Sequence, residues 1–237
     1  MAEPTDLQRK YYETTAGAYD ASHTEREHVV ALHMLCAFIE MNGIKSVLDV
    51  GAGTGRAMRF LKQRFPSMVV KGIEPVEALR IRGHAQGIAE QDLVGGDGAS
   101  LPFADRSVDL VCEFAVLHHV RHPSAVIDEM NRVASRMVVI SDCNFMGQGA
   151  AWLRAVKLTI WSAGLWPMAD WIKTRGKRYT YSEGDGIAYS YSVYQSLRQI
   201  RGAWADVQIY PTSPDAGRYS GPITSAGHVL LVAHKRR

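Results

Sequence analysis

The sequence predicts an α/β protein, with a mostly parallel sheet and helices on both of its faces. Short, almost continuously apolar runs alternate with segments whose apolar residues recur at helical spacing. One such run ends in three glycines at alternate positions, Gly51, Gly53 and Gly55, directly before a helical pattern. Parallel sheets bind ligands at the carboxyl ends of their strands. The polar residues that follow the apolar runs are therefore the candidates for function.

The elements follow from these patterns in chain order. Five strands are expected first, at 46–50, 68–73, 91–94, 107–114 and 136–141. Two more are expected near the end, at 205–210 and 229–233, separated by a Pro/Gly/Ser-rich loop at 211–227. Helical patterns lie at 3–20, 24–42, about 54–64, 76–86, from Pro123 onward, and at 187–200.

Composition bounds the class of protein. The 237 residues are 46% hydrophobic and 22% charged, as in a globular domain, and the net charge is +3. No long Lys/Arg run precedes the C-terminal three residues, so no nucleic-acid partner is indicated. The three cysteines lack metal-ligand spacing, and no metal site is expected. Without a secretory signal or an apolar run long enough to span a bilayer, a cytoplasmic location is expected.

The glycine turn indicates a ligand held close to the backbone. Glycine has no Cβ, and the helix that begins behind it offers unpaired N–H groups. Asp49 places a carboxylate at the end of the strand, where it could meet an ammonium group. Glu74 ends the second strand and could accept hydrogen bonds from ribose hydroxyls. Asp97, after the third strand, could meet an adenine amino group, although it could also simply cap its turn.

Four motifs in register resemble a known family. VLDVGAGTG, IEP, GDGASLPFADRSVDLV and LHHV, spread over residues 45–141, resemble the class I S-adenosylmethionine-dependent methyltransferases. The resemblance is to the small-molecule branch described as methyltransferase domain 11. It implies a Rossmann-like, seven-stranded, mostly parallel sheet whose last strand is antiparallel. It also implies a single domain over 1–237, with N-terminal lid helices at 1–42, a cofactor-binding core at 43–142, a helical acceptor-side cap insertion at 143–200, and final strands at 201–237.

The resemblance also implies the cofactor and its contacts. The cofactor would be S-adenosyl-L-methionine, converted to S-adenosyl-L-homocysteine. The residues at the matching positions are Tyr11, Tyr19, Asp49, Gly51, Ala52, Gly53, Thr54, Gly55, Glu74, Pro75, Asp97, Gly98, Ala99, Glu113, Phe114 and Ala115. The tyrosines belong to an N-terminal segment that closes over the cofactor in many family members.

Two histidines and an acid are the catalytic candidates. A hydroxyl acceptor needs its proton removed by a base. By resemblance to some sugar O-methyltransferases, His118 would be that base, paired with Asp142 after the fifth strand, and His119 is the second choice. The alternative is that both histidines cap the next helix and that alignment alone activates the acceptor.

The stretch 151–178 interleaves tryptophans with Lys and Arg, and three roles are open for it. It could be a helical cap over the substrate, a contact in a homodimer, or an amphipathic surface that touches a membrane. Tyr189 and Tyr191, in the hydroxyl-rich stretch that follows, could line the acceptor pocket.

The sequence therefore predicts methyl transfer from S-adenosylmethionine to a small molecule, first of all to a hydroxyl of a sugar or a glycosylated natural product. N- or C-methylation of a natural product or lipid-linked acceptor is the alternative within the class. A non-catalytic cofactor-binding scaffold is the alternative outside it. An NAD-dependent oxidoreductase is disfavoured, because the glycines read GxGxG and not GxGxxG.

Overall fold

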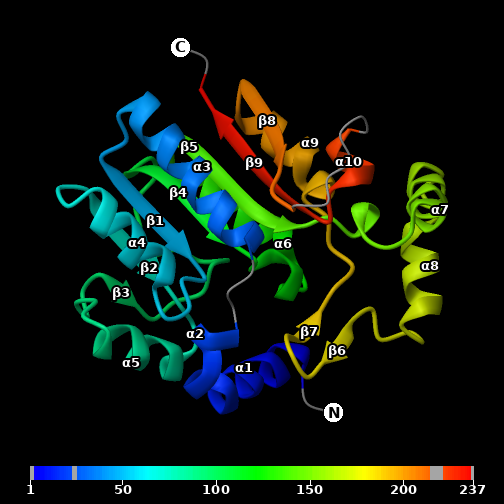
Figure 1. Cartoon of the computed structure of the whole chain (residues 1–237), viewed down its shortest axis with the longest axis horizontal. Helices are drawn as coiled ribbons and strands as arrows, with labels where there is room; N and C mark the ends of the chain where they lie inside the picture. Colours follow the sequence, from blue (N-terminus) through cyan, green and yellow to red (C-terminus); the bar gives the residue numbers. More distant parts are fainter. Residues whose placement is uncertain (1–2, 23–25, 214–220, 236–237) are drawn as a thin grey trace.

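The computed structural model describes residues 3–22, 26–213 and 221–235. Seven of the strands there are β1 (Ser46–Val50), β2 (Val69–Ile73), β3 (Leu93–Val94), β4 (Val108–Phe114), β5 (Ala134–Cys143), β8 (Asp206–Pro211) and β9 (His228–His234). They form one sheet in the order β3-β2-β1-β4-β5-β9-β8 (Figure 1). β9 runs antiparallel to both neighbours, and β1 to β5 are parallel. The predicted fold class is confirmed.

The central strands are apolar because helices cover both of their faces. Leu48 of β1 pairs with Val111 of β4, and neither side chain is exposed to solvent. One core cluster joins the sheet to α3 (Arg26–Asn42) and α4 (Arg56–Arg64). A second joins the other face to α6 (Pro123–Val133) and α9 (Val193–Ala203). α5 (Glu77–Ala85) packs beside β3.

The N-terminal segment lies across the carboxyl end of the sheet. It consists of α1 (Pro4–Thr15), the 3₁₀ turn η1 (Ala16–Ala18) and α2 (Tyr19–Ser22). α1 packs against α5 on one side and on the other against a hairpin, β6 (Thr180–Ser182) and β7 (Gly186–Ala188) (Figure 1). The sequence had not predicted this hairpin. It stands at the same edge as the catalytic candidates, so it brings a distant segment to the site.

Two other expectations change. The helix expected at 187–200 begins only at Val193, because Ser192 caps it: the Ser192 hydroxyl accepts from the Tyr194 N–H, and Gln195 reaches back to the Ser192 N–H. The expected loop at 211–227 contains a short helix, α10 (Pro222–Ser225), while its residues 214–220 lie outside the described part of the chain.

The insertion between β5 and β6 is helical. After the 3₁₀ turn η3 (Phe145–Gly147) it forms α7 (Ala151–Ser162) and α8 (Trp166–Lys173). Figure 1 shows this pair at the edge of the molecule, beyond α10. Among the described residues, no helix combines the length and the apolar character that crossing a membrane requires.

Candidate functional site

The glycine turn lies where β1 ends, next to the point at which the strand order reverses. Gly51 and Gly53 have φ angles of +74° and +57°, which side chains rarely allow. A Cβ on Gly51 would stand 2.4 Å from a methyl of Val116, and one on Gly53 would stand 3.0 Å from the Tyr19 hydroxyl. Gly55 caps the start of α4 in the left-handed region. The turn therefore requires glycine for its backbone and for the space around it.

Two buried carboxylates flank the turn. Glu74, at the end of β2, accepts hydrogen bonds from the N–H groups of Gly53 (2.9 Å) and Val76 (2.8 Å). Burial raises its pKa. Asp49 is 2% exposed, and within the described residues no hydrogen bond reaches its carboxylate. Burial, followed by the charge of Glu74, raises the pKa of Asp49 to about 7. The charge of Arg56 opposes this rise only in part, and a ligand that brings an ammonium group would stabilise the ionised carboxylate further.

The other cofactor candidates lie along the same edge. Asp97 is exposed, and its carboxylate accepts from the Ala99 N–H at 2.9 Å, so it does cap its turn. Gly98 lies between them, close to Val50. Pro75 is exposed after Glu74, and Thr54 is buried with its hydroxyl 2.5 Å from Asp20. Capping uses one carboxylate oxygen of Asp97, and its exposed position leaves the other able to meet a ligand.

The N-terminal tyrosines divide into two groups. Tyr19 lies against the glycine turn, and its ring contacts that of Tyr12 at 5.8 Å. Tyr12 in turn lies 5.9 Å from the ring of His119. Tyr11 points to the hairpin instead and donates its hydroxyl to the carbonyl of Glu183. Tyr12 and Tyr19 thus cover the site, although Tyr12 was not among the predicted site residues. Cofactor contacts of Tyr11 and Tyr19 stay predictions.

The chain bends sharply where β4 ends, next to the glycine turn. Glu113 is fully buried, and one carboxylate oxygen accepts from the Val116 N–H at 2.9 Å. Burial and the charge of Asp142 raise the pKa of Glu113 well above its usual value. Phe114 ends the strand, and Ala115 has a φ of +59°, which costs a non-glycine residue energy. This bend directs the next residues, the two histidines, to the sheet edge.

His118 and Asp142 form a close pair. The His118 Nδ1 lies 2.8 Å from Asp142 Oδ1, and the His118 N–H donates to Oδ2 at 3.2 Å. Burial alone would lower the pKa of His118, but Asp142 and Asp185 outweigh it and raise the pKa to about 10. The imidazole is therefore doubly protonated and positively charged at neutral pH in this arrangement. A role as base requires that the ring first lose this proton, which Asp142 and then Asp185 oppose.

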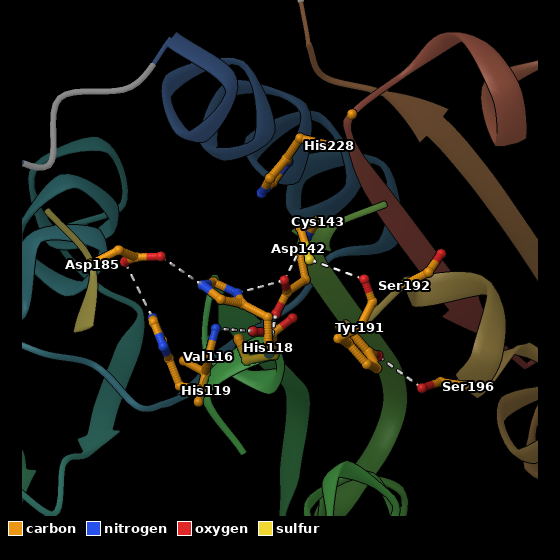
Figure 2. A network of polar contacts seen from close by, with 12 residues as sticks. Val116, His118, His119, Asp142, Cys143, Asp185, Tyr191, Ser192, Ser196 and His228 are labelled. Atoms are coloured by element: carbon orange, nitrogen blue, oxygen red, sulfur yellow. Dashed lines mark hydrogen bonds and ion pairs between the residues drawn. The ribbon is translucent and has the colours of Figure 1, made fainter. Parts of the chain in front are cut away.

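Asp185 comes from the turn of the β6–β7 hairpin and faces both histidines (Figure 2). Its carboxylate lies 3.5 Å from the Nε2 of His118 and 3.4 Å from the Nε2 of His119. The Nδ1 of His119 lies 2.5 Å from the carbonyl of Ile187. The side chain of Gln8 in α1 holds the hairpin through the Asp185 carbonyl and the Ile187 N–H. Asp185 was not among the predicted site residues, and its one signal in the sequence is an acid between two glycines in SEGDG.

Three buried polar atoms without partners belong to strands that meet at this edge of the sheet. Within the described residues, one oxygen of Glu113, the hydroxyl of Ser141 and the Nε2 of His228 have none. Burial, together with His28, lowers the pKa of His228 to about 3, so its ring is neutral. Figure 2 shows His228, at the start of β9, close to Asp142 and Cys143. Buried polar groups are normally satisfied, so these atoms fit contacts with a polar ligand.

The comparisons with known proteins agree with this geometry. Residues 48–138 match the family model described as a methyltransferase domain. This part of the chain is therefore similar to a methyltransferase domain. It is 28% identical to a phthiotriol/phenolphthiotriol dimycocerosates methyltransferase of Mycobacterium ulcerans, over 46% of this chain and 40% of that protein. It is 34% identical to the malonyl-acyl-carrier-protein O-methyltransferase of Methylococcus capsulatus, over 37% of this chain and 32% of that protein. The matches span less than half the length of these relatives.

Solved structures show the same fold over the whole chain. The magnesium protoporphyrin IX methyltransferase of Synechocystis, solved with bound S-adenosylmethionine, superposes with a TM-score of 0.62 at 15% identity, over 100% of this chain and 99% of that one. A methyltransferase of Thermotoga maritima also gives 0.62 at 15% identity, over 96% and 99%. The chain therefore has the fold of the class I methyltransferases, as the sequence motifs predicted.

Proposed function

We propose that this protein transfers a methyl group from S-adenosylmethionine to a small-molecule acceptor. The observation that carries the proposal is the buried carboxylate of Asp49 beside the glycine turn, with Glu74 as a second acid across it. The cofactor's ammonium group pairs with Asp49, its ribose hydroxyls bind Glu74, and its adenine lies toward Asp97 and Ala99. The relatives are methyltransferases of several acceptors, which supports the cofactor and leaves the acceptor open.

The acceptor binds beyond the sulfonium, at the ends of β4 and β5. His118, Asp142 and the neutral ring of His228 face that region (Figure 2). Such a polar lining suits a hydroxylated molecule, and a sugar or a glycosylated metabolite is our first choice. Methyl transfer is an in-line displacement, so the enzyme's main task is to align the acceptor atom with the methyl. The acceptor's proton leaves toward the histidine cluster once His118 is in its neutral form.

Cofactor binding and turnover are tested separately. Calorimetric titration should show binding of S-adenosylmethionine and none of NADH; the reverse result would overturn the cofactor assignment. Formation of S-adenosylhomocysteine is then measured over a panel of sugars, phenols, amines and lipid-linked alcohols. Turnover on amines or carbon acids alone would favour N- or C-methylation. Tight cofactor binding without turnover on any acceptor would favour a non-catalytic scaffold.

We further propose that the α7–α8 pair contacts an anionic membrane surface. Within the described residues α7 buries none of its side chains, while Trp152, Met168, Trp171 and Ile172 are all more than half exposed. Residues 151–178 also contain six basic residues and one acid. Exposed aromatic rings beside Lys and Arg are typical of helices that lie in a lipid headgroup region. The position of the pair at the molecular edge leaves it able to reach a surface (Figure 1).

Sedimentation with vesicles tests this surface. The protein should bind vesicles that contain phosphatidylserine and should not bind pure phosphatidylcholine. Replacing Trp152 and Trp171 by Ser should abolish binding, while Ile81→Ser, an equally exposed apolar residue on α5, should not. If the same double variant instead converts a dimer to a monomer in light scattering, the surface is a homodimer contact and the membrane proposal fails.

A further inference from the structure

We propose that His118, His119 and Asp185 bind a divalent transition-metal ion. Their nearest ligand atoms, two imidazole nitrogens and a carboxylate oxygen, all lie within 4.8 Å of one another. Two histidines come from the turn after β4, and the acid comes from the β6–β7 hairpin (Figure 2). No spacing in the sequence predicts this set, because one ligand is far from the other two along the chain.

The hydrogen bonds of the two rings decide which nitrogens are available. The Nδ1 of His118 is paired with Asp142 at 2.8 Å, and the Nδ1 of His119 faces the carbonyl of Ile187 at 2.5 Å. A carbonyl oxygen accepts only, so the Nδ1 of His119 carries the hydrogen. Both Nε2 atoms then face Asp185. Metal-binding histidines are oriented in this way, with the second nitrogen donating to a carboxylate or a backbone carbonyl.

The distances to Asp185 fit a shared ion better than direct hydrogen bonds. The two Nε2–carboxylate separations are 3.5 Å and 3.4 Å, whereas charge-assisted hydrogen bonds are about 2.7–2.9 Å long. With metal–ligand bonds of about 2.0–2.2 Å, neighbouring ligands of a tetrahedral ion lie about 3.4 Å apart. Two imidazoles and one carboxylate suit Zn²⁺, Mn²⁺, Fe²⁺ or Co²⁺ rather than Ca²⁺ or Mg²⁺, which prefer oxygen.

A second grouping nearby is a weaker candidate. His118, Asp142 and Cys143 also lie within reach of one another. However, Asp142 is already used by the His118 ring and by the Cys143 N–H, and the Cys143 thiol donates to the Tyr191 carbonyl. The protein thus satisfies this group itself, and Asp142 acts in the proposed site as the residue that orients His118.

The ion's use in the reaction rests on the proposed methyl transfer, but its binding does not. Three protein ligands leave coordination positions open for an acceptor oxygen. A bound ion would lower the pKa of that oxygen, and His118 would then be a ligand and not the base. Tyr12 and α1 close over His119 from the cofactor side, so the open positions face the acceptor region.

Metal binding is measured on the chelator-treated protein, without cofactor or acceptor. Titration with Co²⁺ and with Zn²⁺ should show one site per chain, and Co²⁺ should give the visible absorption of a site with nitrogen ligands. Asp185→Ala should weaken the affinity at least 100-fold. Glu183→Gln, which removes an exposed acid from the same turn, should leave it within twofold. Asp142→Asn should weaken it by about 10- to 100-fold, as loss of an orienting partner does.

Two outcomes would overturn the proposal. One is wild-type binding no tighter than that of Asp185→Ala, which would assign any bound metal to other groups. The other is loss of S-adenosylhomocysteine binding in Asp185→Ala together with retained metal affinity. Intact cofactor binding in each variant shows that it is folded. If the protein binds metal but never turns over methyl groups, the metal site stands and the proposed function fails.

Discussion

Asp49→Asn separates stability from cofactor binding more sharply than any other change in the site. The carboxylate is buried, and among the described residues it has no hydrogen-bond partner. Its pKa is raised from 3.8 to about 7, first by burial and then by Glu74. One pKa unit corresponds to about 1.4 kcal/mol, so the ionised form costs the ligand-free fold up to about 4 kcal/mol. A buried, partnerless Asn amide costs about 1–2 kcal/mol.

The sign of the effect depends on pH. Because the pKa is higher in the folded than in the unfolded chain, stability is lost as pH rises from about 4 to 7 and is constant above. The variant should therefore match the wild type near pH 5 and be more stable by about 2–3 kcal/mol at pH 8. Urea denaturation of the ligand-free protein at both pH values measures this difference. Glu77→Gln, at an exposed acid nearby, is the matched control and should change nothing.

Cofactor affinity should move in the opposite direction. Asn cannot neutralise the ammonium of S-adenosylmethionine, so its Kd should rise at least tenfold. The Kd of 5′-methylthioadenosine, which lacks the amino-acid part, should stay unchanged. A variant that is less stable at pH 8, or one that loses affinity equally for both ligands, would show that Asp49 does not hold the ammonium.

Three further predictions concern the same edge of the sheet. Glu74→Gln leaves one of two buried N–H groups without an acceptor, so calorimetry should show S-adenosylhomocysteine binding weakened at least tenfold, and an affinity within threefold of wild type would contradict the ribose role. Gly53→Ala places a methyl 3.0 Å from the Tyr19 hydroxyl at a φ of +57°. It should cost about 1 kcal/mol or more of stability and weaken cofactor binding. Adding Tyr19→Ala to this variant should restore part of the binding. Gly147→Ala would bring a Cβ to 1.9 Å from the Ala226 carbonyl and should destabilise by about 3 kcal/mol or more, whereas Gly184→Ala, with no neighbour within 4 Å, should melt like the wild type.

Local pattern accounts for what could be predicted from the sequence. The strand, turn and helix over Ser46–Arg64 are each determined by their own apolar spacing and by glycines that only a tight turn requires, and the acids after β2 and β3 follow from the same rule. The resemblance to sugar O-methyltransferases paired His118 with Asp142, and the two are in contact, since both follow neighbouring parallel strands. Their catalytic role stays a prediction.

What could not be predicted depends on contacts between distant segments. The β6–β7 strands are three residues each, too short for a periodic signal, and they are held by Gln8 from the other end of the chain. Asp185 reaches the histidines only through that hairpin. His228 begins a strand whose pattern predicts burial, and nothing local distinguishes a ring that faces a polar site from one that packs in the core.

Gln8 also couples any movement of α1 to movement of the β6–β7 hairpin. Its side chain accepts from the Ile187 N–H, donates to the Asp185 carbonyl, and lies 3.4 Å from the His119 ring. The helix that lies across the proposed cofactor site and the hairpin at the proposed acceptor site are thus held together by one amide. If α1 must lift to admit the cofactor, the hairpin lifts with it. We therefore expect a compulsory order in the proposed reaction, with cofactor first and acceptor second, and Gln8→Ala should turn it into a random order in product-inhibition measurements.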